Sequence, residues 1–310
     1  MSDLIAGRSC PLDYQYRPED IAAAPEAFFC DVLYVVGGLY GNPFALKAVE
    51  ELVAREPGAR VVFNGDFHWF DAEDHWFNWI QEGVGAFDAL AGNVEKELAR
   101  DAADAGCGCA YPEKVDQALV ERSNRIHQKL KEQMPKDEAL LDSLKALPSF
   151  MKVEVGGRTL ALVHGDPASL AGWGLDREGI DEPEREASIR SWLQAAKVDA
   201  FASSHTCQPV SRRYPEGVII NNGAAGMPNF NDGLYGVVTR IAAQPGPVKS
   251  LYSTSYQGLI YEALPLHYDA SAWQEWFLNY WPEGSDAWAS YWSRIHKGTS
   301  LSLKDAAPLG

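Results

Sequence analysis

Four side chains that can bind a metal ion each follow a short apolar segment of the sequence. They are Asp66, Asn93, His164 and His205. Any one of them alone is more often a turn residue than a ligand, but each stands near a small residue where an apolar run ends. A carboxylate, an amide and two imidazoles together suit Mn, Fe(II) or Zn. The series therefore predicts a metal site built where several strands end.

The first part of the chain has the pattern of a βαβ unit. Residues 31–36 are a β-branched and aromatic run that ends at two glycines, and residues 61–63 are a second apolar run just before Asp66. Between the runs, Asn42 can cap a helix whose first residue is Pro43. Such a unit implies a right-handed crossover and neighbouring parallel strands. Asp66 is therefore expected at the carboxyl edge of a sheet.

The rest of the body is predicted from the same periodicities. We expect a helix within 71–89, a helical hairpin inserted as a cap at about 112–147, a β-hairpin at 150–163, a helix at 188–196 and a strand at 200–202. Strands at 218–223 and 233–241 are expected to supply the antiparallel half of a second sheet. Residues 1–30 are polar and rich in proline turns, so we interpret them as a wrapping arm and not as a core element.

The chain divides into a body of residues 1–265 and a C-terminal tail of residues 266–310. Aromatic residues recur in the tail at spacings of three and four, which predicts two short helices broken at 282–284. Packing of these helices on the body is the favoured interpretation. A face that binds a partner or a second copy of the chain, giving a homo-oligomer, is the alternative.

The composition limits the classes of function. The 46% hydrophobic fraction of the 310 residues indicates a folded globule with a sizeable core. The 43 acidic and 27 basic residues give a formal net charge of −16, which argues against nucleic acid and anionic membranes as partners. A small phosphorylated substrate would need a local cation. No secretory or membrane segment is recognised and the five cysteines suggest no disulfide framework, so a cytoplasmic protein with reduced thiols is expected.

At these motifs the sequence resembles the calcineurin-like metallophosphoesterase superfamily. The matching stretches are Gly65-Asp66, Gly92-Asn93, His164-Gly165-Asp166 and Ser204-His205-Thr206-Cys207, together with the helix start at Gly41-Asn42. The resemblance covers roughly residues 31–240. It implies an α/β fold, a four-layer α/β/β/α sandwich, with two metals at the carboxyl edge of its sheets. It also implies that Asp66 bridges the metals and that Asn93, His164 and His205 complete the second metal's ligand set.

The sequence departs from the family pattern in the other half of the site. Gly38 and Tyr40 stand where the family has its first aspartate and histidine, and Cys207 stands where it has its last histidine. Val94 replaces the histidine that is thought to protonate the leaving group or steady the transition state. The hydroxyl of Tyr40 could point at a substrate phosphate or simply fill the vacated space.

A substitute ligand for the first metal could come from a side chain nearby. The candidates are His68, Asp71, His75 and Cys207. His68 is the most attractive because it lies two residues after Asp66, although a packed histidine is an equal alternative. Cys207 could ligate as a thiolate or act as a small buried apolar group. The pair Cys107 and Cys109 lies within reach of the site mouth but lacks the two-residue spacer of zinc and redox pairs.

Two hypotheses follow. In the first, the protein is a hydrolase of phosphomonoesters or phosphodiesters in which Asp66, Asn93 and His164 act in catalysis through a metal-activated hydroxide. One divalent metal has a full ligand set and the second does not. Glu95 or Asp166 would orient the ligand imidazoles or bound waters. In the second hypothesis, the chain is a catalytically silent relative that binds a ligand or a partner.

Overall fold

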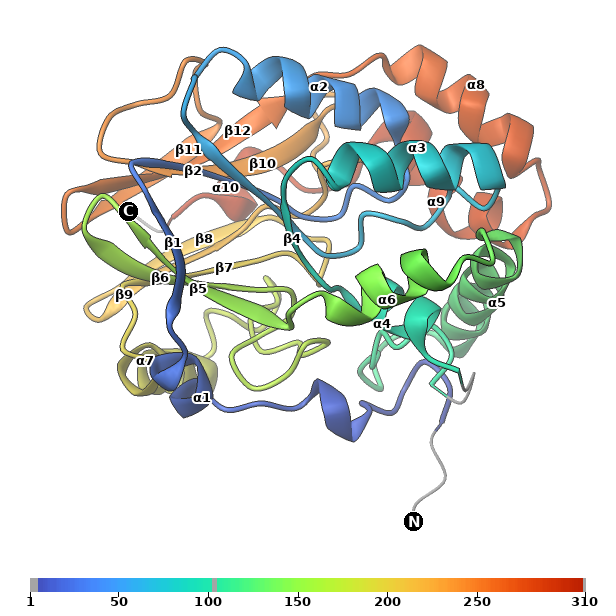
Figure 1. The fold of residues 1–310 in the computed structure, drawn as a ribbon. Helices are drawn as coiled ribbons and strands as arrows, with labels where there is room; N and C mark the ends of the chain where they lie inside the picture. The colour runs from blue at the N-terminus through green and yellow to red at the C-terminus, as the bar shows by residue number, and fades with distance from the viewer. Residues whose placement is uncertain (1–4, 102–104, 309–310) are drawn as a thin grey trace.

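Two six-stranded sheets pack face to face with helices on both outer sides in a computed structural model of the protein (Figure 1). The structure describes residues 5–101 and 105–308. The first sheet has the order β11 (Tyr252–Tyr256), β12 (Leu259–Leu266), β10 (Gly236–Ala242), β2 (Val32–Val36), β3 (Arg60–Asn64), β4 (Asp88–Leu90). The second has the order β1 (Glu26–Cys30), β5 (Phe150–Val155), β6 (Arg158–Val163), β7 (Ala200–Ser203), β9 (Gly217–Asn221), β8 (Val210–Tyr214).

Helices cover the outer face of each sheet, which confirms the predicted four-layer α/β/β/α sandwich (Figure 1). The first sheet carries α2 (Pro43–Val53), α3 (Asp74–Val84), α8 (Ala270–Tyr280) and α9 (Asp286–Lys297). The second carries α1 (Pro18–Ala23) and α7 (Pro183–Ala196). The remaining helices are η1 (Leu12–Tyr14), α4 (Asn93–Ala99), α5 (Gln117–Gln133), α6 (Glu138–Ala146) and α10 (Leu303–Ala306).

The continuous apolar runs of the central strands reflect burial on both faces. In β2, Leu33 and Val35 lie in the core between the sheets, whereas Tyr34 and Val36 lie in the core under the outer helices. A strand covered on both sides has no polar face, because neither face meets water. The predicted βαβ unit is confirmed, since β2, α2 and β3 follow one another and the two strands pair in parallel.

The strands that precede the predicted ligands are parallel neighbours within each sheet. β3 pairs in parallel with β4, and β6 pairs in parallel with β7. The carboxyl ends of parallel strands meet at one edge of a sheet, so side chains that follow them are brought together. This topology is the reason that four residues spread over 140 positions of sequence can form one site.

Two expectations about the sheets were wrong. Residues 1–30 are more than an arm, because β1 pairs in parallel with β5 and both Tyr14 and Ile21 are fully buried. The strand predicted at 233–241 does not join the second sheet. As β10 it pairs antiparallel with β2 and β12 in the first sheet. An apolar run indicates a strand but does not specify its partner, which is set by packing across the whole fold.

The insertion and the tail contact each other at one end of the molecule. Two helices, α5 and α6, occupy the predicted insertion, but they do not pack on each other as a hairpin, because α5 packs on α9 and α6 packs on α4. Arg125 of α5 forms a 2.6 Å ion pair with Asp286 at the start of α9. The tail packs on the body as favoured, because the indole of Trp281 donates a 2.8 Å hydrogen bond to the carbonyl of Phe70. Among the helices of the described ranges, none combines the length and apolar character needed to cross a membrane.

Candidate metal centre

The loop that carries Asp66 is held in an unusual backbone conformation by Glu95. Asp66 has a φ of +52°, a left-handed value that aspartate tolerates better than most residues. The Glu95 carboxylate accepts hydrogen bonds from the backbone N–H groups of Asp66 at 2.9 Å, Phe67 at 3.0 Å and Gly92 at 2.8 Å. One buried side chain thus joins the end of β3 to the start of α4.

Four donor atoms converge beside this loop, as the sequence predicted. The Nε2 atom of His164 lies 3.3 Å from Asp66 Oδ1, 3.2 Å from Asn93 Oδ1 and 3.2 Å from His205 Nδ1. Asp66, His164 and His205 are all buried, and their ligand atoms lie within 4.8 Å of one another. The structure therefore brings together the complete ligand set that was predicted for one metal.

Backbone carbonyls orient three of these side chains toward one point. His164 Nδ1 lies 2.8 Å from the carbonyl of Asn64, and His205 Nε2 lies 3.1 Å from the carbonyl of Cys109. Each imidazole donates that outer N–H, so its other nitrogen presents a lone pair to the cluster. The amide nitrogen of Asn93 donates to the carbonyl of Cys107 at 2.8 Å, which turns Oδ1 inward. The residues that orient a metal ligand set are present here.

The donor spacing fits a bound divalent ion. Tetrahedral ligand atoms at bond lengths of about 2.0–2.2 Å lie about 3.3–3.6 Å apart. The three separations from His164 Nε2, at 3.2–3.3 Å, are close to this range. The donor set consists of one carboxylate, one amide oxygen and two imidazoles. This mixture of nitrogen donors and hard oxygen donors suits Mn, Fe(II) or Zn. Asp66, Asn93, His164 and His205 would hold the ion.

The charges around the cluster favour a cation. Burial alone raises the pKa of Asp66, but the charge and hydrogen bond of His164 outweigh burial and lower it. Burial likewise lowers the pKa of His164, yet the Asp66 carboxylate outweighs it and raises that pKa. Burial, with the charge of His164, lowers the pKa of His205 to about 3, so this imidazole is neutral and ready to ligate. Because the Asp66 carboxylate favours the protonated form of His164, metal binding competes with protonation of this imidazole.

The other half of the expected site is filled by protein. The hydroxyl of Tyr40 forms a short contact with the Sγ atom of Cys207, and both residues line the cavity next to Asp66. A Cβ atom on Gly38 would lie 2.7 Å from the Tyr40 ring, and Gly38 has a φ of +64°, so no side chain fits there. Tyr40 and Cys207 thus occupy the space where the resemblance places the first metal's ligands.

His68 does not reach the cluster, so the prediction that it substitutes as a ligand was wrong. Its Nδ1 lies 2.6 Å from the Asp71 carboxylate and its Nε2 lies 3.0 Å from Gln81. Its ring stacks on Phe77 with centroids 3.8 Å apart. Both ring nitrogens are therefore engaged away from Asp66. His75 is also remote, because it is exposed on α3 among surface tryptophans.

The buried His68–Asp71 pair predicts a pH-dependent stability. Burial lowers the pKa of His68, but the Asp71 carboxylate outweighs burial and raises it. The stabilisation is complete below the unfolded pKa of about 6.5 and is lost as the pH rises through the folded value. Asp71→Asn should therefore lower the free energy of unfolding by about 3 kcal/mol below pH 6.5 and by less at alkaline pH.

Urea unfolding of the wild type and the variant over this pH range measures the difference. Asp74→Asn, which changes an exposed carboxylate three residues further on, at the start of α3, is the matched control. A difference between Asp71→Asn and the wild type that grows toward alkaline pH would contradict the assignment.

Glu95 or Asp166 was predicted to orient the ligand imidazoles or bound waters, but neither carboxylate forms a hydrogen bond with a ligand imidazole. Glu95 acts on the backbone of the ligand loop, as described above. Asp166 accepts hydrogen bonds from the backbone N–H groups of Ala168 at 2.8 Å, Ser169 at 3.0 Å and Gly174 at 2.8 Å. It thereby shapes the loop that carries Trp173, whose ring packs edge-on against His205 with centroids 5.3 Å apart.

Residues 107–109 act on the site through their backbone, a role that was not predicted from the sequence. Gly108 approaches Asn93 so closely that a Cβ atom would lie 3.3 Å from the Asn93 Cβ atom and 2.5 Å from the Tyr14 hydroxyl. The carbonyls on either side of Gly108 orient Asn93 and His205. The glycine between two cysteines could have indicated this segment, but the groups that orient the ligands are the backbone carbonyls and not the thiols.

A cavity of about 160 Å³ opens beside the cluster, and the sequence did not predict most of its aromatic walls. Its lining includes aromatic side chains from five separate segments, namely Tyr40, Trp69, Tyr111, Trp173 and Tyr291. Val94 and Leu119 add apolar surface. Tyr111 and Leu119 come from the segment before and at the start of the insertion, and Tyr291 comes from the tail. The insertion and the tail therefore complete the cavity.

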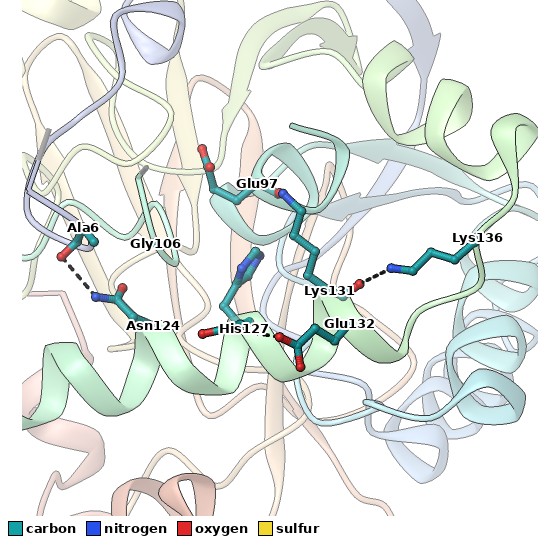
Figure 2. A pocket seen from close by; sticks show the side chains of 9 residues that line it. Ala6, Glu97, Gly106, Asn124, His127, Lys131, Glu132 and Lys136 are labelled. Carbon is teal, nitrogen blue, oxygen red and sulfur yellow. Dashed lines mark hydrogen bonds between the residues drawn. The ribbon is translucent and has the colours of Figure 1, made fainter. Parts of the chain in front are cut away.

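A second cavity of about 480 Å³ lies beside α5, and none of the four predicted ligands lines it (Figure 2). Lys131 donates hydrogen bonds to the carbonyls of Glu97 and Arg100, and Lys136 donates to the carbonyl of Lys131. Figure 2 shows the Glu97 carboxylate pointing away from Asn124 and His127. The charged groups that surround this cavity are already engaged, so it is a weaker candidate than the metal cluster.

Comparison with solved structures finds the same architecture elsewhere. A hypothetical protein from Pyrococcus horikoshii OT3 has a TM-score of 0.58 and 14% sequence identity, over 87% of this chain and 99% of that one. A metallophosphoesterase from Sphaerobacter thermophilus has a TM-score of 0.54 and 14% identity, over 87% of this chain and all of that one. No protein-family model and no curated protein sequence matches the chain.

The fold and the cluster define a class of protein, an α/β/β/α sandwich with metal-ligand side chains at the carboxyl ends of its parallel strands. The chain shares its fold with the metallophosphoesterase from Sphaerobacter thermophilus, which agrees with the fold that the resemblance in the sequence implied.

Proposed function

We propose that the protein is a metal-dependent phosphoesterase that works with one divalent ion. The observation that carries this proposal is the convergence of Asp66, Asn93, His164 and His205 on one point, with their outer atoms tied to backbone groups. A structural role alone would not require two imidazoles and an amide oxygen to converge on a buried carboxylate. The metallophosphoesterase from Sphaerobacter thermophilus, which shares the fold, supports the same class of reaction.

When bound, a divalent ion would lower the pKa of a water molecule and polarise a phosphoryl oxygen. The protein's own residues supply the rest. Asp66, Asn93 and His205 line the cavity, so a group held by the cluster would face it. The aromatic walls exclude bulk water and so strengthen the electrostatic interactions within the cavity. Tyr40 and Cys207 close the side that a second ion would use.

Metal content is the first test of this proposal. We expect one equivalent of Mn, Fe or Zn per chain after chelation and reconstitution, with an affinity that rises with pH because the ion competes with protonation of the ligand imidazoles. Plasma emission spectrometry gives the stoichiometry. Hydrolysis of 4-nitrophenyl phosphate and bis(4-nitrophenyl) phosphate by the loaded protein gives the activity. Two equivalents per chain would show that Tyr40 and Cys207 do not close the second position.

A catalytically silent relative is the second candidate, and the same closed side of the site supports it. Tyr40 stands where the resemblance expects a ligand imidazole, and Val94 stands where it expects a histidine that acts on the substrate. One equivalent of metal with no turnover of either ester would favour this candidate. The cluster would then be a site that binds a phosphate group without cleaving it.

A further inference from the structure

The cavity beside the cluster contains no basic side chain to neutralise a phosphate. Within the described part of the chain, neither lysine nor arginine lines it. Arg294 comes near, but its guanidinium donates to the carbonyls of Pro228 at 2.7 Å and Cys207 at 3.1 Å. The chain carries a formal net charge of −16, and Asp66 adds a negative charge at the site itself. A phosphate that enters must therefore carry as little negative charge as possible.

Charge separates the two ester classes that the proposed function allows. A phosphomonoester is largely a dianion at neutral pH, because its second pKa is about 6. A phosphodiester carries one negative charge. While its bound water is neutral, one divalent ion together with the Asp66 carboxylate carries about one positive charge, which matches the single charge of the diester and leaves the monoester's second charge without a partner.

The cavity also lacks a side chain suited to protonating a leaving group. A general acid works best with a pKa near the operating pH. His205 is engaged in the cluster, and the other lining groups with dissociable protons are tyrosines and cysteines, which release their protons only at higher pH. A leaving oxygen attached to an aromatic ring depends less on such an acid, because a phenolate, with a conjugate-acid pKa of about 10, is a much weaker base than an alkoxide.

The dimensions and walls fit an aromatic ring. A cavity of about 150 Å³ lined by apolar side chains can hold benzene, and this one measures about 160 Å³. Trp69 and Tyr291 meet edge to face with centroids 6.4 Å apart on one side. Trp173 and Tyr111 lie with centroids 5.9 Å apart as another pair of the lining. Aromatic walls favour a flat guest through ring packing as well as burial.

We propose that the site selects monoanionic phosphodiesters in which the leaving oxygen is attached to an aromatic ring. This inference rests on the proposed phosphoesterase function. In the reaction, the oxygen of one water forms a new bond to phosphorus and the bond from phosphorus to the aromatic oxygen breaks. The electron pair of that bond leaves on the phenolate, and the two protons of the water pass to solvent. Trp69 and Tyr291 are the residues that recognise the ring.

Binding of three phosphates by calorimetry tests the selection separately from turnover. The probes are diphenyl phosphate, dimethyl phosphate and phenyl phosphate, each added to the manganese-loaded protein. Diphenyl phosphate should bind at least about 10-fold more tightly than either of the others, a difference of about 1.4 kcal/mol. Equal or tighter binding of phenyl phosphate would overturn the charge argument. Equal binding of dimethyl phosphate, or no binding by any probe, would overturn the role of the aromatic wall.

Variants of the wall complete the test. Trp69→Leu and Tyr291→Leu should each remove most of the preference for diphenyl over dimethyl phosphate while the metal content stays at the wild-type level. Trp79→Leu, which removes a tryptophan that is 54% exposed on α3, should leave all three affinities unchanged. If diphenyl phosphate binds selectively but methyl 4-nitrophenyl phosphate is not hydrolysed, then the proposed activity fails and the binding preference stands. If Tyr291→Leu folds and keeps the preference, this inference fails.

Discussion

His164→Ala should abolish metal-dependent ester hydrolysis and reduce metal binding to a trace. His164 Nε2 is the atom that lies within 3.3 Å of Asp66 Oδ1, Asn93 Oδ1 and His205 Nδ1, so its loss removes the centre of the ligand set. A bound ion contributes several kcal/mol of transition-state stabilisation, which corresponds to on the order of 10³-fold in rate. Steady-state kinetics with 4-nitrophenyl esters and metal analysis of the purified variant measure both effects.

Loss of folding must be separated from loss of the metal in this experiment. His75→Ala is the matched control, because it removes an exposed imidazole from α3 and should change neither metal content nor rate. Circular dichroism and the urea midpoint of His164→Ala establish whether the fold survives. A folded His164→Ala protein that keeps one equivalent of metal, or that hydrolyses the esters at the wild-type rate, would refute the assigned centre.

The sequence was sufficient to predict the ligand set because parallel strands impose a simple geometry. Asp66, His164 and His205 each follow a run whose burial on both faces leaves no alternation of polar residues. Such runs end at the sheet edge, where the next polar side chain is exposed to the site. The local pattern therefore carried information about a contact between residues that are far apart in sequence.

The partners of the edge strands could not be predicted in the same way. β10 is an apolar run like its neighbours, and nothing in its own residues distinguishes a place beside β2 from a place in the other sheet. β1, which alternates half-buried and exposed residues, was hidden in a segment dominated by proline turns. Pairing depends on the packing of the whole molecule, which local propensity does not contain.

The aromatic lining of the cavity and the carbonyls that orient the ligands could not be predicted from the sequence for a related reason. Trp69, Tyr111, Trp173 and Tyr291 come from four loops or helices with no common motif, and each alone is an ordinary aromatic residue. The orienting groups at residues 107 and 109 are carbonyls, which every residue possesses. One side of the site departs from the family pattern. The structure explains this side, because it places Tyr40 against Gly38 and Cys207.

Glu95→Ala should cause the largest loss of stability among single substitutions near the centre. It would leave the N–H groups of Asp66, Phe67 and Gly92 buried without an acceptor. Each such group costs about 1–3 kcal/mol, so we expect the free energy of unfolding to fall by about 3–5 kcal/mol. Asp66 would also lose the support for its φ of +52°, so the metal affinity should fall as well.

Glu95→Gln separates the hydrogen bonds from the charge. Burial, followed by the charge of Asp66, raises the pKa of Glu95, so the ionised carboxylate is itself unfavourable in the folded protein. Glutamine removes that charge but keeps one acceptor oxygen, so its loss of stability should be smaller than that of alanine. Glu51→Ala, an exposed carboxylate on α2, should have an effect within about 0.5 kcal/mol of zero. Urea unfolding that ranked glutamine below alanine would show that Glu95 acts through its charge on the metal ligands and not through the backbone that positions Asp66.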